Sequence, residues 1–356
     1  MIDPKRLAAE IEDLSYSYPA VTEERKPLSQ RYLMRERSFY IGDVFIKNPL
    51  IAAPLAGISD NTFRMFSSYF GSALNYSEMI SSNGIKFKDK KSLDLAKVTG
   101  FERPCSIQIF GNDPDVMATA AKIIEEMADI IDINMGCPVH KILKSKSGGF
   151  LLKDTENAKR IMEAVIGAVS KPVTVKTRLG WDDDNNVSKI ARAAQDLGIS
   201  ALCIHGRKVK QGYKGFADNG LSEEIAGSLK IPVIFSGDID DPLKADRLLD
   251  SSNCKGIMIG RAIRARHHLL KDIYLNLNSK KMTIGQKDPG IGWVKTYLDL
   301  YLRSIISFKG EYRGIREFRK HFSWSLKGRK GAAAMRKKIF ELEDISQALR
   351  LIYSIK

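Results

Sequence analysis

Cysteine and histidine are scarce in this chain of 356 residues, which has four Cys and five His. Cys105, Cys137, Cys203 and Cys254 form no CxxC pair and show no metal-ligand spacing. A structural zinc site needs clustered Cys or His ligands, and disulfide frameworks are typical of small secreted domains. We therefore expect no metal site and no disulfide framework, and each cysteine needs its own explanation.

Long apolar runs are also missing. No run reaches the roughly 18–20 residues that span a bilayer. The N-terminal stretch MIDPKRLAAEIEDLSY carries acidic residues early and lacks the apolar segment of a secretory signal. With 44% hydrophobic and 28% charged residues, the composition is that of a soluble globular protein. These features predict a cytoplasmic protein that does not associate with a membrane.

Acidic residues are outnumbered by basic ones, and the excess is uneven. The chain has 57 Lys and Arg against 42 Asp and Glu, a net charge of +15. Residues 290–356 alone carry 15 Lys and Arg against 6 Asp and Glu. Such an excess indicates a polyanionic partner, most simply nucleic acid. A basic surface that only aids solubility is the alternative, and charge alone does not decide between the two.

What the chain does contain is a repeat of short apolar, β-branched runs, each followed by a stretch with helical features. The eight runs are LIAAP (50–54), ALNYSEM (73–79), CSIQIFG (105–111), IIDINMG (130–136), PVTVKTRLG (172–180), SALCIHG (200–206), IPVIFSG (231–237) and GIMIG (256–260). Eight such units over about 220 residues predict a (β/α)8 TIM barrel, whose strands are buried on both faces. A doubly wound sheet is the alternative, but its GxGxxG turn is not found.

Outside this repeat the pattern changes. Residues 1–38 mix charged residues with SYSYP and are predicted to form an N-terminal extension, followed by a hairpin with Gly-Asp at its turn. The barrel is expected over residues 39–285. Residues 286–356 have helical periodicity without strand runs, which predicts a small all-helical domain of three or four helices. KGRKGAAA (327–334) is expected to be a loop between two of them.

Polar residues gather where the predicted strands end, which is where barrels of this class place their chemistry. They are Gln108, Asn134, Cys137, Lys176, Arg178, His205, Ser236, Gly237, Asp238, Gly260 and Arg261. Gln108 has a structural alternative as a satisfied inward amide, and His205 has one as a core histidine. Lys176 lies in an apolar strand, where an ammonium is costly without an anionic partner.

Together these strand ends favour a cofactor that carries a phosphate. Gly237 and Gly260 end the seventh and eighth strands, where barrels often bind phosphate through backbone N–H groups. Arg261 adds a bidentate donor, and Lys176 adds a second positive charge. Flavin mononucleotide (FMN) fits this set in size and chemistry, because a lysine near its N1–C2=O edge would stabilise the anionic reduced ring.

Cys137 stands on a Gly-Pro turn directly after the fourth strand. Packing is the alternative to chemistry, and it is our interpretation of the other three cysteines. We find no activating base beside Cys137 in the sequence, and His140 is expected at the surface. A neutral thiol that delivers a proton suits the reduction of a polarised C=C bond, with hydride from a flavin and the proton from the opposite side.

At this point the chain resembles the tRNA-dihydrouridine synthases, most closely their bacterial branch. The matching segments are LIAAPLAGISDNTFR, IQIFG, DINMGCPVHKI with SGGFLLKD, VTVKTRLGWD, IHGRKVKQGYKGFAD, IPVIFSGDID and GIMIGRAI, which cover residues 40–265 in order, and FRKHFSWSLKG with GAAAMRKKI in the helical part. Ser236 departs from the family pattern, in which Asn is usual, and Asn219-Gly220 follows FAD where Trp is common. The N-terminal extension is longer than usual.

The resemblance implies an FMN-dependent enzyme that reduces uridine in RNA, most simply tRNA, to 5,6-dihydrouridine, with NADPH as the reductant of the flavin. It implies that hydride passes from flavin N5 to uracil C6 and that Cys137 gives the proton to C5. The residues it assigns to the flavin are Pro54, Leu55, Ala56, Gln108, Asn134, Lys176, His205, Ser236, Gly237, Asp238, Gly260 and Arg261, of which Asn134 meets either flavin or uracil.

RNA contacts follow from the same reading, because a base in folded RNA must be extruded to reach such a pocket. Basic side chains would supply sequence-independent phosphate contacts with a salt-dependent affinity. The residues expected to make them are Arg178, Arg207, Arg316, Arg319, Lys320, Lys327, Arg329 and Lys330. No obligate protein partner is evident.

Three alternatives stay open beside this interpretation. Ribosomal RNA is a possible substrate of the same chemistry. A small-molecule flavin oxidoreductase of the dihydroorotate-dehydrogenase type has no use for a basic helical appendage. A non-catalytic RNA-binding barrel has no need of Cys137, Gln108, Lys176 and Arg261 together.

Overall fold

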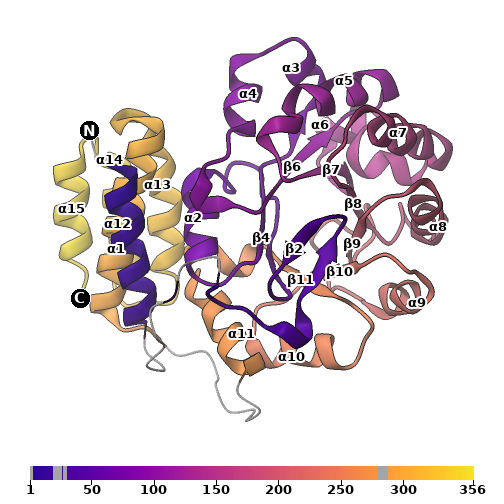
Figure 1. Cartoon of the computed structure of the whole chain (residues 1–356). Coiled ribbons are helices and arrows are strands. Elements are labelled where there is room, and N and C mark those ends of the chain that lie inside the picture. The colour runs from indigo at the N-terminus through magenta and orange to yellow at the C-terminus, as the bar shows by residue number, and fades with distance from the viewer. Residues whose placement is uncertain (1–2, 19–25, 27–29, 279–287) are drawn as a thin grey trace.

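A closed ring of parallel strands with helices around it forms the larger part of the protein (Figure 1). The computed structural model describes residues 3–18, 26, 30–278 and 288–356. The strands are β3 (Leu50–Ala52), β4 (Leu74–Tyr76), β5 (Ile80–Ser81), β6 (Cys105–Phe110), β7 (Ile130–Met135), β8 (Val173–Arg178), β9 (Ala201–His205), β10 (Val233–Ser236) and β11 (Gly256–Ile259).

The sheet closes because β4 pairs with β6 as well as with β3. The short β5 continues along the same edge of β6, so β4 and β5 together fill one of eight strand positions. All the pairings in this ring are parallel. The predicted (β/α)8 barrel is therefore confirmed, each of the eight predicted runs contains a strand, and the closure excludes an open doubly wound sheet.

Helices follow the strands and cover the outside of the ring. They are α2 (Asn61–Tyr69), α3 (Ser82–Lys86), α4 (Lys90–Ala96), α5 (Pro114–Ile124), α6 (His140–Lys144), α7 (Thr155–Ala168), α8 (Val187–Leu197), α9 (Gly220–Ser228), α10 (Pro242–Asp250) and α11 (His268–Asn278). The α5 start follows its sequence, because the Asp113 carboxylate accepts from the Val116 N–H at 2.9 Å and Pro114 is the first helical residue.

The predicted hairpin is also present and lies at the end of the barrel away from the strand C-termini. Its strands β1 (Phe39–Ile41) and β2 (Val44–Ile46) are antiparallel. Gly42 at the turn has a φ of 59°, and a Cβ built on it would lie 2.6 Å from Pro172 Cγ. Because Pro172 directly precedes β8, the turn packs on the N-terminal side of the ring, where a larger residue would not fit.

A helical bundle stands beside the barrel (Figure 1). It contains α12 (Ile291–Lys309), α13 (Glu311–Ser325), α14 (Ala332–Glu341) and α15 (Ile345–Tyr353), in line with the expected three or four helices. The loop predicted at 327–334 is shorter than expected, because α14 already begins at Ala332. Alanine has the highest helix propensity of all residues, and three consecutive alanines, 332–334, form the first turn of α14. None of the helices in the described ranges has the length and apolar character that crossing a bilayer requires.

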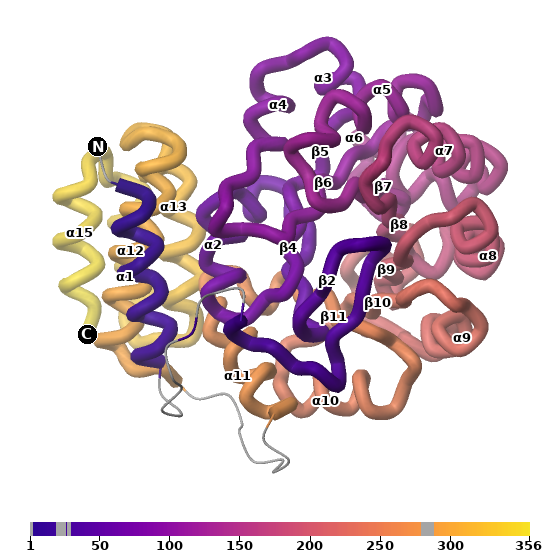
Figure 2. The backbone as a smooth tube through the Cα atoms, viewed as in Figure 1, coloured from indigo at the N-terminus to yellow at the C-terminus, as the bar shows by residue number. Residues whose placement is uncertain are grey.

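The N-terminal extension supplies a further helix of this bundle, α1 (Pro4–Ser17). Figure 2 shows α1 running alongside α12, although some 280 residues separate them in the chain, and the two helices are in contact. Leu7, Ile11 and Leu14 are buried on its inner face. The Trp293 indole donates to the Leu14 carbonyl at 3.3 Å and ties α1 to α12.

Aromatic side chains fill the junction between the barrel and the bundle. Phe66 of α2 packs edge-to-face on Tyr297 of α12, with ring centroids 5.3 Å apart. His267, just before α11, places its Nδ1 2.7 Å from the Tyr297 hydroxyl. His321 of α13 lies 4.5 Å from Tyr301, centroid to centroid. Burial lowers the pKa of His267 and of His321 well below the ordinary value, so both imidazoles are neutral in the folded protein.

Acid is expected to destabilise the protein through these two histidines. Below about pH 6.5 the unfolded chain binds protons that the buried imidazoles do not accept, so the free energy of unfolding falls as the pH drops. Each histidine contributes up to about 1.4 kcal/mol per pH unit. In the described residues neither nitrogen of His321 has a hydrogen-bond partner. The His321→Phe variant should therefore fold at neutral pH and lose less stability on acidification.

Urea denaturation at a series of pH values measures this slope. The matched control is His140→Gln, because His140 is exposed at the start of α6. We expect the control to follow the wild type. A His321→Phe variant whose stability falls as steeply as that of the wild type would contradict the prediction.

Candidate active site

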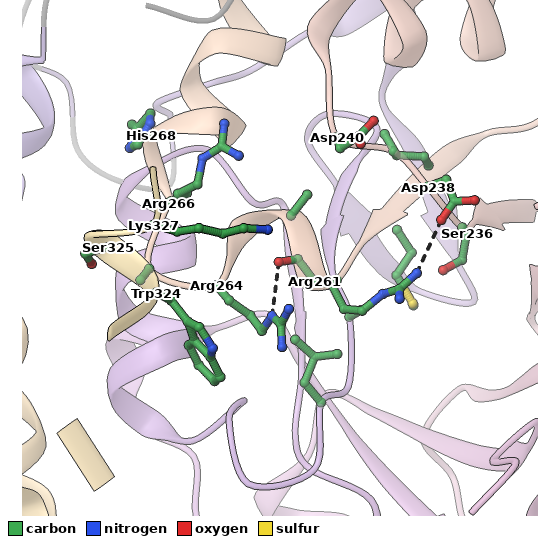
Figure 3. Close-up of a pocket in the computed structure, with 18 of the residues that line it drawn as sticks. Ser236, Asp238, Asp240, Arg261, Arg264, Arg266, His268, Trp324, Ser325 and Lys327 are labelled. Atoms are coloured by element: carbon green, nitrogen blue, oxygen red, sulfur yellow. Dashed lines mark hydrogen bonds and ion pairs between the residues drawn. The ribbon is translucent and has the colours of Figure 1, made fainter. Parts of the chain in front are cut away.

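A cavity of about 780 Å³ opens at the C-terminal ends of the strands and extends towards the bundle (Figure 3). Cavities of roughly 300–1,000 Å³ are typical of small-molecule and cofactor sites. The cavity is lined by nine of the residues that the sequence assigned to a flavin: Pro54, Leu55, Lys176, His205, Ser236, Gly237, Asp238, Gly260 and Arg261. These residues come from five strand ends, and the barrel brings them to one place.

Lys176 enters the cavity from β8. Among the described residues, no carboxylate or hydrogen-bond acceptor is paired with its ammonium group. Its strand neighbour in the sheet is Asn134 of β7. An ammonium group in a half-buried position is costly without a partner. The cavity is therefore suited to a ligand that presents an anionic or carbonyl oxygen to Lys176.

His205 lies beside it at the end of β9. Burial, followed by the charges of Lys176, Arg178, Arg207 and Arg261, lowers the pKa of His205 to about 2. The side chain is therefore neutral, with one nitrogen as donor and the other as acceptor. Its buried Nδ1 has no hydrogen-bond partner among the described residues. A polar ligand in the cavity would satisfy it.

Gly237 shapes the part of the cavity where a phosphate was predicted. Its φ of +122° favours glycine, and an added Cβ would lie 2.7 Å from Ala217 Cβ. The backbone therefore approaches the cavity without a side chain in the way. Gly260 has no such constraint, because an added Cβ would make ordinary contacts of 3.4 Å with Ala53 and Leu55.

Asp238 uses its carboxylate on arginines. One oxygen accepts from Arg207 Nη2 at 2.6 Å and from the Ala217 N–H at 2.8 Å, and the other accepts from Arg261 Nη2 at 3.3 Å. Burial acts to raise the pKa of Asp238, but these hydrogen bonds and the arginine charges outweigh it and hold the pKa below its usual range. A carboxylate repels phosphate, so its role is to hold Arg207 and Arg261 in place.

A chain of hydrogen bonds runs under the cavity from Asp132 to Cys137. Gln108 donates from Nε2 to Asp132 Oδ2 at 2.7 Å, and its Oε1 accepts from Asn134 Nδ2 at 2.7 Å. Asn134 Oδ1 in turn accepts from the Cys137 N–H at 3.0 Å. Thr174 donates to the second oxygen of Asp132 at 2.6 Å. Because Asp132 accepts at one end and backbone N–H groups donate at the other, both amides have a fixed orientation.

Cys137 follows β7 and is 8% exposed. Burial raises the pKa of its thiol above the ordinary value, which the Val139 N–H and the charges of Arg178 and Lys176 only partly offset. The thiol is therefore protonated at neutral pH. Gly149 packs closely on the backbone of this turn: its N–H donates to the Cys137 carbonyl at 3.1 Å, and a Cβ there would lie 2.9 Å from that oxygen.

The three other cysteines are buried, as expected for packing. Burial raises the pKa of Cys105 and of Cys203 to about 12, so neither is reactive at neutral pH. His140 is exposed at the first position of α6. Nothing in the structure pairs it with Cys137.

Three residues predicted to contact the flavin do not line this cavity. Gln108 is fully buried with both ends of its amide satisfied, and Asn134 is 7% exposed beneath Cys137. Ala56 is exposed in the loop after β3. Gln108 thus has the satisfied inward amide that the sequence offered as its structural alternative.

Two residues predicted to contact RNA are inside the protein. Arg178 is 3% exposed and donates to the Gly136 carbonyl at 2.8 Å and to the Gly212 carbonyl at 2.7 Å. Arg207 is 2% exposed and binds Asp238. Both guanidinium groups position the loops around Cys137 and the cavity.

The predicted RNA contacts of the bundle lie nearer the surface. Lys327 and Arg329 line the cavity, and Arg329 pairs with Asp288 at 2.6 Å. Lys320 donates to the Gly57 carbonyl and Arg319 to the Leu342 carbonyl. Arg316 lies over the Tyr312 ring, and Lys330 is exposed.

Sequence reasoning missed several residues of the site. Asp132 had a signal, because an acidic residue inside the apolar run IIDINMG needs partners as much as Lys176 does. Tyr213, Arg264 and Trp324 also line the cavity. They had no such signal, because their approach depends on how the β9 loop and the bundle fold back over the barrel.

Substitutions of Asp132 test the hydrogen bonds that it accepts from Gln108 and Thr174. The Asp132→Leu variant leaves Gln108 Nε2 and the Thr174 hydroxyl without an acceptor, at a cost of about 1–3 kcal/mol for each group. The Asp132→Asn variant retains an acceptor for Gln108. We therefore expect the leucine variant to lose stability in urea denaturation and the asparagine variant to stay close to the wild type near neutral pH.

The pH dependence distinguishes a buried carboxyl from a merely space-filling residue. Burial raises the pKa of Asp132 to about 7, against opposing hydrogen bonds from Thr174 and Gln108. An unfolded aspartate ionises near pH 4, so the Asp132 carboxyl contributes a loss of stability as the pH rises from about 4 towards 7, opposite in sign to the contribution of the buried histidines. The Asp132→Asn variant should lack this loss. Equal pH profiles of the two proteins over this range would refute the assignment.

The chain is similar in sequence to known proteins over most of its length. Residues 50–355 match the family model described as dihydrouridine synthase. A protein of Vibrio cholerae named tRNA-dihydrouridine synthase B is 39% identical over 87% of this chain and 96% of its own length. Proteins of the same name from Vibrio vulnificus and Proteus vulgaris are 40% and 38% identical, over 83% and 88% of this chain and 92% and 96% of their own lengths.

Solved structures share the fold at much lower identity. An old yellow enzyme homologue from Zymomonas mobilis aligns with a TM-score of 0.54 and 16% identity, over 73% of this chain and 97% of that one. A histamine dehydrogenase from Rhizobium sp. 4-9 aligns with a TM-score of 0.53 and 15% identity, over 67% and 47%. At these identities the likeness concerns the barrel fold alone.

Proposed function

Because the chain belongs to the dihydrouridine synthase family, we propose that it is a flavin-dependent enzyme that reduces uridine in tRNA to 5,6-dihydrouridine. The observation that carries the proposal is the protonated, buried thiol of Cys137 next to a cavity that contains the unpaired ammonium of Lys176. The substrate is that named for the relatives that match most of the chain.

FMN fits the residues of the cavity. Lys176 and the neutral His205 offer polar contacts to the ring system, and Nδ1 of His205 needs a partner. The side-chain-free Gly237 and the guanidinium of Arg261 suit the phosphate end. Bound there, FMN would supply the hydride that reduces uracil at C6, after its own reduction by NADPH.

Cys137 would supply the proton. Its raised pKa keeps the thiol protonated, so it acts as a general acid towards uracil C5. The hydrogen bond from its backbone N–H to Asn134 and the hydrogen bond from the Gly149 N–H to its carbonyl fix the turn that carries the thiol. Because the thiol is largely buried, the base has to leave the RNA stack to reach it, as in other enzymes that act on a nucleobase.

The basic bundle would hold the RNA. Lys327 and Lys330 are exposed on the loop after α13, and Arg316 is exposed on α13 itself. Such contacts neutralise phosphates regardless of sequence and weaken as the salt concentration rises. A small-molecule flavin oxidoreductase has no use for this surface.

Purified protein provides the direct test. The protein should bind FMN with a flavin absorption spectrum, and with NADPH it should convert uridine to dihydrouridine in tRNA that lacks the modification. Mass spectrometry of digested tRNA detects the product as a gain of 2 Da, which corresponds to two hydrogen atoms. Ribosomal RNA serves as the comparison substrate. Protein that cannot be loaded with FMN, or loaded protein that leaves the tRNA unchanged, would refute the proposal.

A further inference from the structure

The cavity has a second arm beyond the phosphate end predicted for FMN. One wall comes from the segment between β11 and α11, with Arg264, and the other comes from the end of α13, with Trp324, and the loop after it, with Lys327. Figure 3 shows Arg264 and Lys327 extending into the same open space, with the Trp324 ring below Arg264. The barrel and the bundle therefore build this arm together, and it exists only when they are docked.

Two of the cations that line this arm, Arg264 and Lys327, have no carboxylate partner among the described residues. The carboxylates that line the cavity are Asp238, Asp240 and Asp288. Asp238 binds Arg207 and Arg261, Asp240 binds Lys244, and Asp288 binds Arg329. Among the described residues, no carboxylate pairs with Arg264 or Lys327.

Arg264 is nevertheless held in place. Its Nε donates to the Arg261 carbonyl at 3.2 Å, and its guanidinium carbon lies 4.7 Å from the centroid of the Trp324 ring. Burial, followed by the charge of Arg261, lowers the pKa of Arg264. Cations packed against one another in this way are unfavourable unless an anion binds between them. An anion in this part of the cavity would offset the repulsion.

We propose that Arg264, Lys327 and Trp324 form a phosphate site, separate from that of the cofactor, which binds a backbone phosphate of the RNA close to the extruded uridine. This inference rests on the proposed function and specifies its RNA contact. A phosphodiester supplies the missing negative charge, and a guanidinium with an ammonium is a common pair of donors for it. The neighbouring loop residue Lys330 is exposed and continues the positive surface outwards.

The position of the site argues for RNA over a nucleotide reductant. Half of it is supplied by the bundle, whose segment 290–356 carries 15 Lys and Arg against 6 Asp and Glu. A long polyanion can contact the cavity and this surface at once. In the barrel, Gly237 and Arg261 already provide for the phosphate of FMN, so Arg264 and Lys327 remain for a second phosphate.

The test compares Arg264→Gln and Lys327→Gln with a control of equal charge change, Lys230→Gln. Lys230 is exposed in the loop before β10, on the opposite end of the barrel. We expect each site variant to raise the Kd for tRNA about five- to tenfold at low salt and to reduce the slope of log Kd against log salt by about one. The FMN content and the rate of flavin reduction by NADPH should stay unchanged, and the control should match the wild type.

Other outcomes would overturn the inference in distinct ways. A raised KM for NADPH with unchanged tRNA affinity would show that the site binds the phosphates of NADPH. Loss of FMN from the site variants would show that Arg264 and Lys327 bind the cofactor. Unchanged binding of tRNA, NADPH and FMN would show that they bind none of these ligands. Because tRNA binding is measured directly, the inference fails independently of the proposed function, which fails if the wild type makes no dihydrouridine.

Discussion

The Cys137→Ala variant is expected to reduce uridine in tRNA about 10²–10⁴-fold more slowly than the wild type, the range by which a positioned general acid accelerates a reaction. The reason is the missing proton. Burial keeps the wild-type thiol protonated, and no other acid among the described residues is held at this turn. Water reaches it poorly, because Cys137 is only 8% exposed.

The measurement separates proton delivery from cofactor binding. Enzyme reduced beforehand with NADPH is mixed with unmodified tRNA, and flavin reoxidation is followed by absorbance without oxygen. The FMN content and the rate of reduction by NADPH should be those of the wild type, because Cys137 does not line the cavity. Cys203→Ala is the matched control, since Cys203 is a buried cysteine on β9, with β8 between it and β7, and contacts Met258. Loss of FMN from the Cys137→Ala variant would contradict the role of proton donor.

The barrel was predictable from the sequence because its signals are local. Each strand is a short apolar run that ends at Gly, Pro or a polar residue, and parallel strands buried on both faces need such runs. The position of the cavity followed from the same rule, since Lys176, His205 and Gly237 stand at strand ends and line it. Lys176 was informative for a further reason: an ammonium group in an otherwise apolar strand is costly without an anionic partner, which points to a ligand.

The roles of other residues depend on distant contacts, which no local pattern contains. Asp238 looked like a phosphate contact, but its position between Arg207 and Arg261 makes it their counter-ion. Arg178 looked like an RNA contact, but it donates to backbone carbonyls of two loops. The extension looked like an appendage, and its helix α1 completes the bundle. In each case the partner is brought near only by the closure of the barrel or the docking of the bundle.

A large loss of stability is expected from a single change at Arg64. This residue of α2 is 1% exposed, and its Nε is 2.6 Å from Oε2 of the fully buried Glu102. Removing one member of a buried ion pair leaves the other as an uncompensated charge, which costs about 3–5 kcal/mol. We therefore expect Arg64→Leu to lower the free energy of unfolding by that amount in urea denaturation.

The same variant should weaken the cofactor site, because Arg64 also supports the loop after β3. Its Nη1 donates to the Ser59 carbonyl at 2.7 Å, and Ser59 accepts the Leu55 N–H on its Oγ at 2.9 Å. Since Leu55 lines the cavity, FMN affinity should fall together with stability.

The double variant Arg64→Leu/Glu102→Leu removes the orphaned charge and should recover part of the stability. It should not recover the FMN affinity, because the hydrogen bond from Arg64 to the Ser59 carbonyl is still missing. Arg6→Leu, which breaks an exposed pair with Glu10 on α1, should change neither quantity appreciably. A double variant that regained full FMN affinity would show that Arg64 acts only through its charge pair and that the loop is held by other contacts.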